Sequence, residues 1–401
     1  MKSVSLPIFS EVKAAAEKPQ GWPFLRLGFR PFYLGGTLVA ALAVPLWVAM
    51  FMGGISSSPA VPALLWHAHE MLFGFAIAII VGFLMTAGKN WTGLATPRGA
   101  SLGALALLWL CTRIAALTGP GLLYALLDMA LLPLVAGIFA RLLLRAKNFR
   151  NLPLALILTL LAAANLVFHL AALGLLDVPA MTPLHAALGL IIIIESVIAG
   201  RVVPAFTMSA TPGLRIQTAS TQERLTLGLT AVGLLLWVFA PAGVWGLLVL
   251  LAAASLHAKR LWGWRPLLTR HKPILWILHA AYAWIALGLL LLAMAQMGWL
   301  PVSAGVHALA VGATGGLIIG MATRTARGHT GRPLTVSTPE VAAYGLVMAA
   351  ALLRVLVPLL LPGFYMTALV LSASAWSVAF FIYLWVYAPW LMQTRLDGKD
   401  G

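Results

Sequence analysis

The chain has 401 residues, of which 62% are hydrophobic and 9% are charged, and its formal net charge is +16. Because a soluble domain usually carries about 25% charged residues, this composition excludes an ordinary soluble protein and indicates a chain that mostly faces lipid. The single cysteine, Cys111, excludes disulfides, cysteine-ligated iron–sulfur clusters and a CxxCH haem attachment.

In chain order, residues 1–20 contain no apolar run, which excludes a signal peptide and predicts a short cytoplasmic tail. Residues 22–32 alternate aromatic and basic side chains, which predicts a segment at the membrane surface. From Tyr33 to Pro389, apolar stretches recur that are long enough to cross a bilayer core of about 30 Å. They have to be helical, because lipid offers the backbone no hydrogen-bond partners.

We therefore predict an all-α polytopic membrane protein with a single domain over residues 1–401. A tail and interfacial segment at 1–32 precedes a bundle at 33–389, and a second tail follows at 390–401. The twelve predicted transmembrane helices span residues 33–53, 66–88, 101–118, 121–143, 153–173, 182–203, 225–241, 243–259, 273–296, 302–323, 341–361 and 364–388.

The basic residues predict the orientation of this bundle. Of the 26 Lys and Arg residues, all but Arg113 and Arg354 fall in the two tails, in the even-numbered connections or at the helix ends beside them. By the positive-inside rule, both termini lie in the cytoplasm. The net charge is then explained by topology and by contact with anionic lipid, and nucleic acid is not a predicted partner.

Arg113 and Arg354 lie inside predicted helices, where charges are costly and usually paired. Arg113 lies at a depth similar to that of Asp128 on the next, antiparallel helix, which favours a structural ion pair. The alternative, for either arginine, is that it holds an acidic cofactor group such as a haem propionate.

Five histidines lie near the predicted outer ends of the helices, within roughly 8 Å at 1.5 Å per residue: His67, His69, His169, His185 and His307. They share one depth, which is the first requirement for sharing one site. A single histidine near a helix end, however, is usually a satisfied interfacial residue. His67 and His69 point about 200° apart on a helix, so they cannot easily bind one ion.

The spacing of three histidines favours ligation. His67, His185 and His307 are separated by 118 and 122 residues, and each opens the second helix of a predicted four-helix unit. This pattern predicts a threefold parallel repeat with three imidazoles at a common height. Imidazole suits haem iron and copper, and Glu70 is a candidate for orienting one imidazole.

Two further features belong to this predicted core. The stripes Gly312–Gly316–Gly320 and Gly74–Ala78–Gly82 admit either a neighbouring helix or a flat porphyrin face. Glu195 lies ten residues inward of His185 and is a candidate proton carrier, with a hydrogen bond to a neighbouring helix as the structural alternative.

Three segments closely resemble the NnrS family: GFRPFYL (28–34), WHAHEMLFGFAIAIIVGFLMTAGKNWTG (66–93) and HALAVGATGGLIIGMATRTARGHTGRPL (307–334). The resemblance implies a bacterial inner-membrane protein that contains haem and copper and is associated with denitrification and nitrosative stress. It also implies a cofactor site built on His67, His69, His185 and His307, without specifying which histidine binds which metal.

Three functions follow from these expectations. The first is an oxidoreductase that reduces or scavenges nitric oxide with electrons from an unknown donor, with His185, alone or with His169, holding copper beside the haem. The second is a metal-dependent nitric oxide sensor or protector without turnover. The third is a multispan solute transporter, against which the threefold repeat and the scarcity of buried charge argue.

Overall fold

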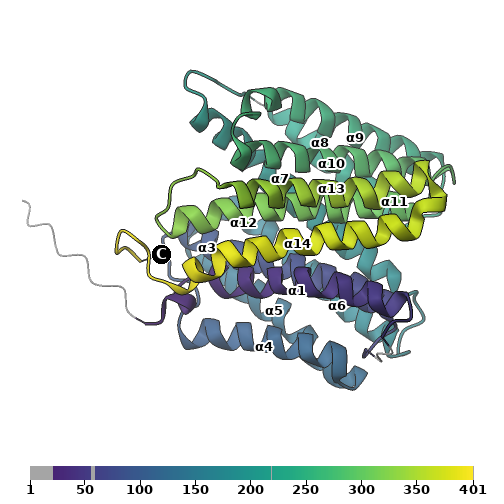
Figure 1. Cartoon of the computed structure of the whole chain (residues 1–401), viewed down its shortest axis with the longest axis horizontal. Coiled ribbons are helices and arrows are strands. Elements are labelled where there is room, and N and C mark those ends of the chain that lie inside the picture. Colours follow the sequence, from purple (N-terminus) through teal and green to yellow (C-terminus); the bar gives the residue numbers. More distant parts are fainter. Residues whose placement is uncertain (1–20, 56–58, 218, 401) are drawn as a thin grey trace, which may run out of the picture.

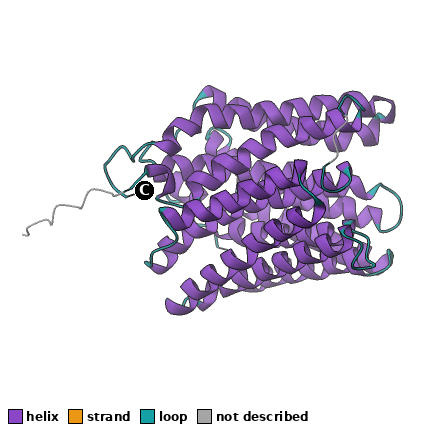
Figure 2. Cartoon of the chain, turned by 90° about the horizontal axis from the view of Figure 1, so that it is seen from below, coloured by secondary structure: helices purple, strands orange, loops and turns teal. Residues whose placement is uncertain are grey.

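The computed structural model describes residues 21–55, 59–217 and 219–400, so the predicted tail at 1–20 lies outside the described residues. Within these ranges the chain is helical and contains no strand (Figure 2). The first of twelve helical rods is α1 (Phe29–Phe51). The second joins α2 (Ala63–His69), a π-helical segment η2 (Glu70–Ala76) and α3 (Ile77–Thr92).

Seven rods then follow: α4 (Ala100–Thr118), α5 (Gly121–Arg145), α6 (Leu152–Ala172), α7 (Met181–Ala210), α8 (Ser220–Phe239), α9 (Val244–Gly263) and α10 (Pro273–Ala295). The tenth rod joins α11 (Val302–His307), a second π-helical segment η5 (Ala308–Gly315) and α12 (Gly316–His329). The last two are α13 (Thr338–Leu360) and α14 (Tyr365–Met392). The prediction of twelve long helices is confirmed.

Eleven of these rods are long and apolar enough to cross a membrane. The exception is α8, which begins with a polar first turn containing Glu223 and packs between α7 and α9. The rods run side by side along one axis (Figure 1). The chain is therefore a multi-pass membrane protein.

The start of α1 and the C-terminus lie at the same end of the bundle (Figure 1), as an even number of passes requires. We call this the basic end, because the Lys- and Arg-bearing connections lie there, including the one between α12 and α13. Its location in the cytoplasm stays a prediction from charge.

The second rod of each four-helix unit lies in the middle of the bundle. The apolar windows of these rods are 83%, 56% and 67% buried, whereas most of the other rods reach only 33–44%. Segment α7 contacts α2 and η2 of the second rod and η5 of the tenth rod, so it packs against both other histidine-bearing rods. The three histidine-bearing rods therefore lie together inside the bundle, as the predicted repeat requires of them.

The glycine stripes serve helix packing. A Cβ atom on Gly312 would lie 2.3 Å from the Trp284 ring on α10, and one on Gly316 would lie 2.6 Å from the Cβ of Ala281. In the other stripe, Gly82 packs against the backbone of α1. The neighbouring helices take up the space that a flat cofactor would need along these stripes.

The second half of the segment predicted to lie at the membrane surface is instead buried in the first helix. Phe29 begins α1 and is fully buried, as are Arg30 and Phe32. The Arg30 guanidinium donates hydrogen bonds of 2.8 Å to the carbonyl oxygens of Leu391 and Gln393, at the end of α14. Helix α1 therefore starts four residues before its predicted start, because those carbonyls satisfy the buried arginine.

A histidine-lined cavity and a buried polar network

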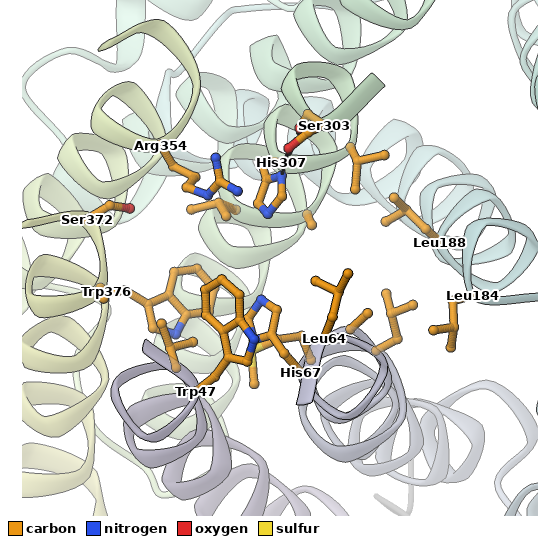
Figure 3. Close-up of a pocket in the computed structure, with 18 of the residues that line it drawn as sticks. Trp47, Leu64, His67, Leu184, Leu188, Ser303, His307, Arg354, Ser372 and Trp376 are labelled. Carbon is orange, nitrogen blue, oxygen red and sulfur yellow. Dashed lines mark hydrogen bonds between the residues drawn. The ribbon is translucent and has the colours of Figure 1, made fainter. Parts of the chain in front are cut away.

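A cavity of about 470 Å³ lies between the second rods (Figure 3). Its lining residues His67, His185 and His307 lie near the helix ends opposite the basic end. His67 from α2, His185 from α7 and His307 from α11 all line the cavity. The three regularly spaced histidines therefore converge on one space, as their separation predicts. A cavity of this volume is in the range that holds a drug-sized or cofactor-sized molecule.

His307 is fixed by its own helix. Its Nδ1 lies 2.8 Å from the backbone oxygen of Ser303, one turn earlier, and 3.1 Å from the Ser303 hydroxyl. The carbonyl can only accept, so Nδ1 carries the hydrogen and Nε2 keeps its lone pair. This is the tautomer and the kind of support that metal-ligating histidines use.

His67 lies on the other side of the cavity. Its ring stacks on Trp47 of α1, with the ring centroids 4.3 Å apart and the planes at 21° (Figure 3). Its Nδ1 is buried and has no hydrogen-bond partner among the described residues. Buried polar atoms normally have a partner, so His67 is an imidazole that the described residues leave incompletely satisfied.

The cavity wall is mainly apolar and aromatic. Trp47, Phe75 and Trp376 line it, and the His185 ring lies 4.7 Å from the Trp237 ring of α8. Such a wall, with a few polar groups, suits a largely apolar ligand whose orientation is set by those groups.

Arg354 of α13 adds a positive charge to this wall, beside His307 (Figure 3). Its guanidinium lies 5.8 Å from the Tyr365 ring. No carboxylate of the described chain lies within 4.0 Å of it. The predicted alternative for Arg354, an acidic group on a ligand, is chemically compatible with this position.

His69 and His169 lie elsewhere, in a buried polar network formed by the junction of α2 and η2 together with α4, α5 and α6. His69 Nδ1 lies 2.6 Å from the Tyr124 hydroxyl, and its Nε2 lies 2.9 Å from Asn165 Oδ1 and 3.1 Å from Asp128 Oδ2. His169 Nε2 lies 3.0 Å from the same Asp128 oxygen. Because the two side chains point about 200° apart around the helix, as expected, His67 lines the cavity and His69 points away from it.

The predicted ion pair between Arg113 and Asp128 is present in this network. Arg113 also donates to Glu70 at 2.7 Å. Glu70 lies 3.6 Å from His69 Nδ1, so its main partner is the arginine rather than an imidazole. Arg113 does not line the cavity, and two carboxylates already use its charge.

Ligand atoms of His69, Asp128 and His169 lie within 4.8 Å of one another, so this group could hold a metal ion. The sequence analysis did not identify Asp128 as a possible metal ligand, and it did not single out Tyr124 or Asn165. A signal was available, because Tyr124 and Asp128 are four residues apart on α5, as are Asn165 and His169 on α6. Residues four apart share a helix face.

Glu195 is buried in the middle of α7, with 8% of its surface exposed. Its Oε2 accepts a hydrogen bond of 3.1 Å from the Thr314 hydroxyl of η5. The structural alternative for Glu195, a bond to a neighbouring helix, is therefore present. Its Oε1, however, has no partner among the described residues, and the Glu195 side chain lines a second, smaller and mainly apolar cavity.

The fold and the cavity define a class of protein: a multi-pass membrane protein whose three central helices each contribute a histidine to an apolar cavity. The chain belongs to the NnrS family, since the family model described as NnrS protein matches residues 23–395. A comparison with curated proteins finds no match.

Proposed function

We propose that the chain is a haem- and copper-binding protein of the bacterial inner membrane that reduces or scavenges nitric oxide in the large cavity. Membership of the NnrS family supports this proposal. The single observation that carries it is the convergence of His67, His185 and His307 on one cavity. Imidazoles from separate helices of a bundle core are a common way of holding haem iron and copper.

The residues present fit a haem. His307 offers a free Nε2, His67 has an unsatisfied ring nitrogen, and the wall between them is aromatic. We assign His67 and His307 to the haem, and Arg354 to one of its acidic groups. A haem held here would supply an iron centre that exchanges electrons, and it would bind a diatomic molecule at a position that one of these two imidazoles leaves open.

Other side chains of the cavity have separate tasks. Trp47, Phe75 and Trp376 exclude water from it, which suits an apolar gas that arrives through lipid. Thr314 lines the cavity and donates to Glu195. Glu195 is therefore the acid placed to hold a proton near the reaction, and the electron donor is a partner that the chain does not identify.

We place copper at His185, beside the haem in the same cavity. The competing location is the His69–Asp128–His169 group. In that group Asp128 already accepts from four neighbours, among them the Arg113 guanidinium. A divalent cation there would have to replace two imidazole protons next to a fixed positive charge, which disfavours binding.

The test is metal analysis and an optical spectrum of the purified protein and of single His→Ala variants. We expect His67→Ala and His307→Ala to lose haem, and His185→Ala to lose copper while it keeps haem. The matched control is His279→Ala, because His279 is also buried but bonds Thr207 of α7 away from the cavity. Haem and copper contents that stay unchanged in all cavity variants would refute the assignment.

A fifth variant, His69→Ala, separates the two copper locations. Loss of copper in this variant but not in His185→Ala would place copper in the polar network. Retention in His69→Ala and loss in His185→Ala would support the cavity.

Turnover needs its own assay. Nitric oxide should shift the main haem absorption band of the purified protein, and the protein should then consume nitric oxide continuously when a reductant supplies electrons. Binding without consumption would favour the sensor or protector instead. A metal-replete protein whose spectrum ignores nitric oxide would contradict both functions.

A further inference from the structure

Two methionine side chains, Met71 and Met181, line the large cavity together with the histidines, and neither has a part in the proposed function. Met71 lies in η2, four residues after His67, and Met181 begins α7, four residues before His185. Residues four apart share a helix face. Two of the three central rods therefore present an imidazole and a thioether together to the cavity.

The third histidine-bearing rod lacks such a pair. His307 is followed four residues later by Val311, which lines the same cavity with an apolar side chain. The two rods that carry the methionines pack on each other, since α7 contacts both α2 and η2. The two histidine–methionine pairs therefore lie on adjoining walls of the cavity.

The α7 side of the cavity offers neutral donors only. Figure 3 shows Leu184 and Leu188 of α7 on the opposite side of the cavity from Arg354, the positively charged residue of the wall. Among the described residues that line this cavity, none is Asp or Glu. A metal ion beside α7 would therefore meet imidazole and thioether groups without a carboxylate to balance its charge.

The chemistry of these donors selects both the metal and its charge. Thioether sulfur is a soft ligand that selects Cu(I), and imidazole also suits copper. A charge that is taken out of water is costly unless it is compensated, and the cost rises with the charge of the ion. In a mainly apolar wall without carboxylates, a monovalent ion is therefore favoured over Cu(II) and Zn²⁺.

The structural alternative is that both methionines only fill space, which is the common use of methionine in protein cores. The same wall contains Leu72, Leu184 and Leu188, so packing does not require a sulfur atom at either methionine position. Leucine has nearly the volume of methionine and lacks the sulfur. A Met→Leu substitution therefore separates a ligand from a residue that only packs.

We propose that Met71 and Met181 are thioether ligands that hold Cu(I), together with His185, on the side of the large cavity formed by α7 and η2. The inference rests on the proposed function for the copper at His185. It adds two sulfur ligands and the oxidation state of the metal. Neither His67 nor His307 is needed for this site, so both stay assigned to the haem.

The test is a Cu(I) titration of the purified full-length protein against a coloured Cu(I) chelator, without oxygen and with a thiol-free reductant. We expect Met71→Leu and Met181→Leu each to weaken Cu(I) binding by more than about tenfold, because even the outer partners of metal ligands are worth about tenfold to a hundredfold. Both variants should keep the wild-type haem content. Met85→Leu is the matched control and should bind Cu(I) like the wild type, because Met85 is fully buried and does not line the large cavity.

X-ray absorption at the copper edge adds a readout that a packing role would not change. The copper-loaded wild type should show sulfur neighbours, and their signal should fall in each leucine variant at equal copper loading. Wild-type Cu(I) affinity in either leucine variant overturns the three-ligand site, as does a copper shell without sulfur, and both results leave copper at His185 in place. A wild-type protein that binds no Cu(I) would instead refute the copper assignment of the proposed function, together with this site.

Discussion

Asp128 is the central acceptor of the buried polar network, so its removal tests whether that network is structural. Its carboxylate accepts from Arg113, from Asn165 Nδ2 at 2.7 Å and from the Nε2 atoms of His169 at 3.0 Å and His69 at 3.1 Å. In Asp128→Ala all four donors lose this acceptor inside the bundle. Breaking a buried ion pair by deleting one partner usually costs about 3–5 kcal/mol.

A second contact of Arg113 narrows the range expected for this free-energy cost. Glu70 still accepts from Arg113 at 2.7 Å in the variant, so the arginine keeps one counter-charge. We therefore expect the lower limit, about 3 kcal/mol of unfolding free energy for Asp128→Ala. Asp128→Asn keeps the shape and part of the hydrogen bonding, so it should cost about half as much.

The assay is reversible unfolding in mixed micelles with increasing sodium dodecyl sulfate, followed by tryptophan fluorescence. Asp177→Ala is the matched control, because Asp177 is exposed in the connection between α6 and α7 and should change stability by less than about 0.5 kcal/mol. A loss below about 1 kcal/mol in Asp128→Ala would refute the structural interpretation. Loss of a bound metal in the same variant would instead support a metal site at His69 and His169.

Three further predictions concern packing, orientation and the cavity charge. Gly312→Ala should destabilise the protein by about 1–3 kcal/mol through overpacking against α10, whereas Gly345→Ala, with open space around its Cβ, should be neutral or stabilising by up to about 1 kcal/mol; equal stability of the two variants would contradict this packing. In a background without the native cysteine, a membrane-impermeant thiol reagent applied to intact cells should label Asp177→Cys but not Ser220→Cys, and the reverse pattern would invert the topology. Arg354→Gln should weaken haem binding roughly tenfold to a hundredfold by titration, the loss of one charge-assisted hydrogen bond, and unchanged affinity would remove Arg354 from the site.

The number of helices was predictable because hydropathy and basic residues each report on a single coordinate, the position along the membrane normal. Apolar run lengths locate the spans, and Lys and Arg mark one end of them. The errors lie at the helix ends. The first helix begins at Phe29 instead of residue 33, and the last continues to Met392 instead of residue 388. In both places, contacts of Arg30 with the end of α14 outweigh the local sequence signal.

The candidate site was only partly predictable, because depth along a helix does not determine which way a side chain points around it. The repeat spacing supplied that missing information for His67, His185 and His307, which occupy equivalent positions and line one cavity. His169 shares their depth but belongs to no such series, and its helix, α6, turns it towards Asp128. A shared depth is therefore a necessary condition for a common site and not a sufficient one.

The small cavity was not predictable at all. Glu195 was recognisable as a buried acid, but Tyr33 was assigned to the first residue of a lipid-spanning helix, with no indication that its hydroxyl is enclosed. Cavities arise where several helices fail to fill a space, and that depends on their mutual rotation. The pattern of apolar and polar residues along the sequence contains no information about this rotation.

The two π-helical segments have a consequence for the direction in which two of the histidine-bearing rods present their histidines. Each segment follows its histidines directly, with η2 after His69 and η5 after His307, whereas α7, which bears His185, contains none. A π turn accommodates one extra residue, and one residue corresponds to about 100° of rotation in an α-helix. Deleting a single residue from η2 or η5 would therefore swing the histidine about a quarter turn relative to the inner half of its rod. Each of these two rods therefore consists of two helical pieces joined by a π segment. A one-residue deletion in that segment would change the direction of the histidine while the packed inner piece stays in place.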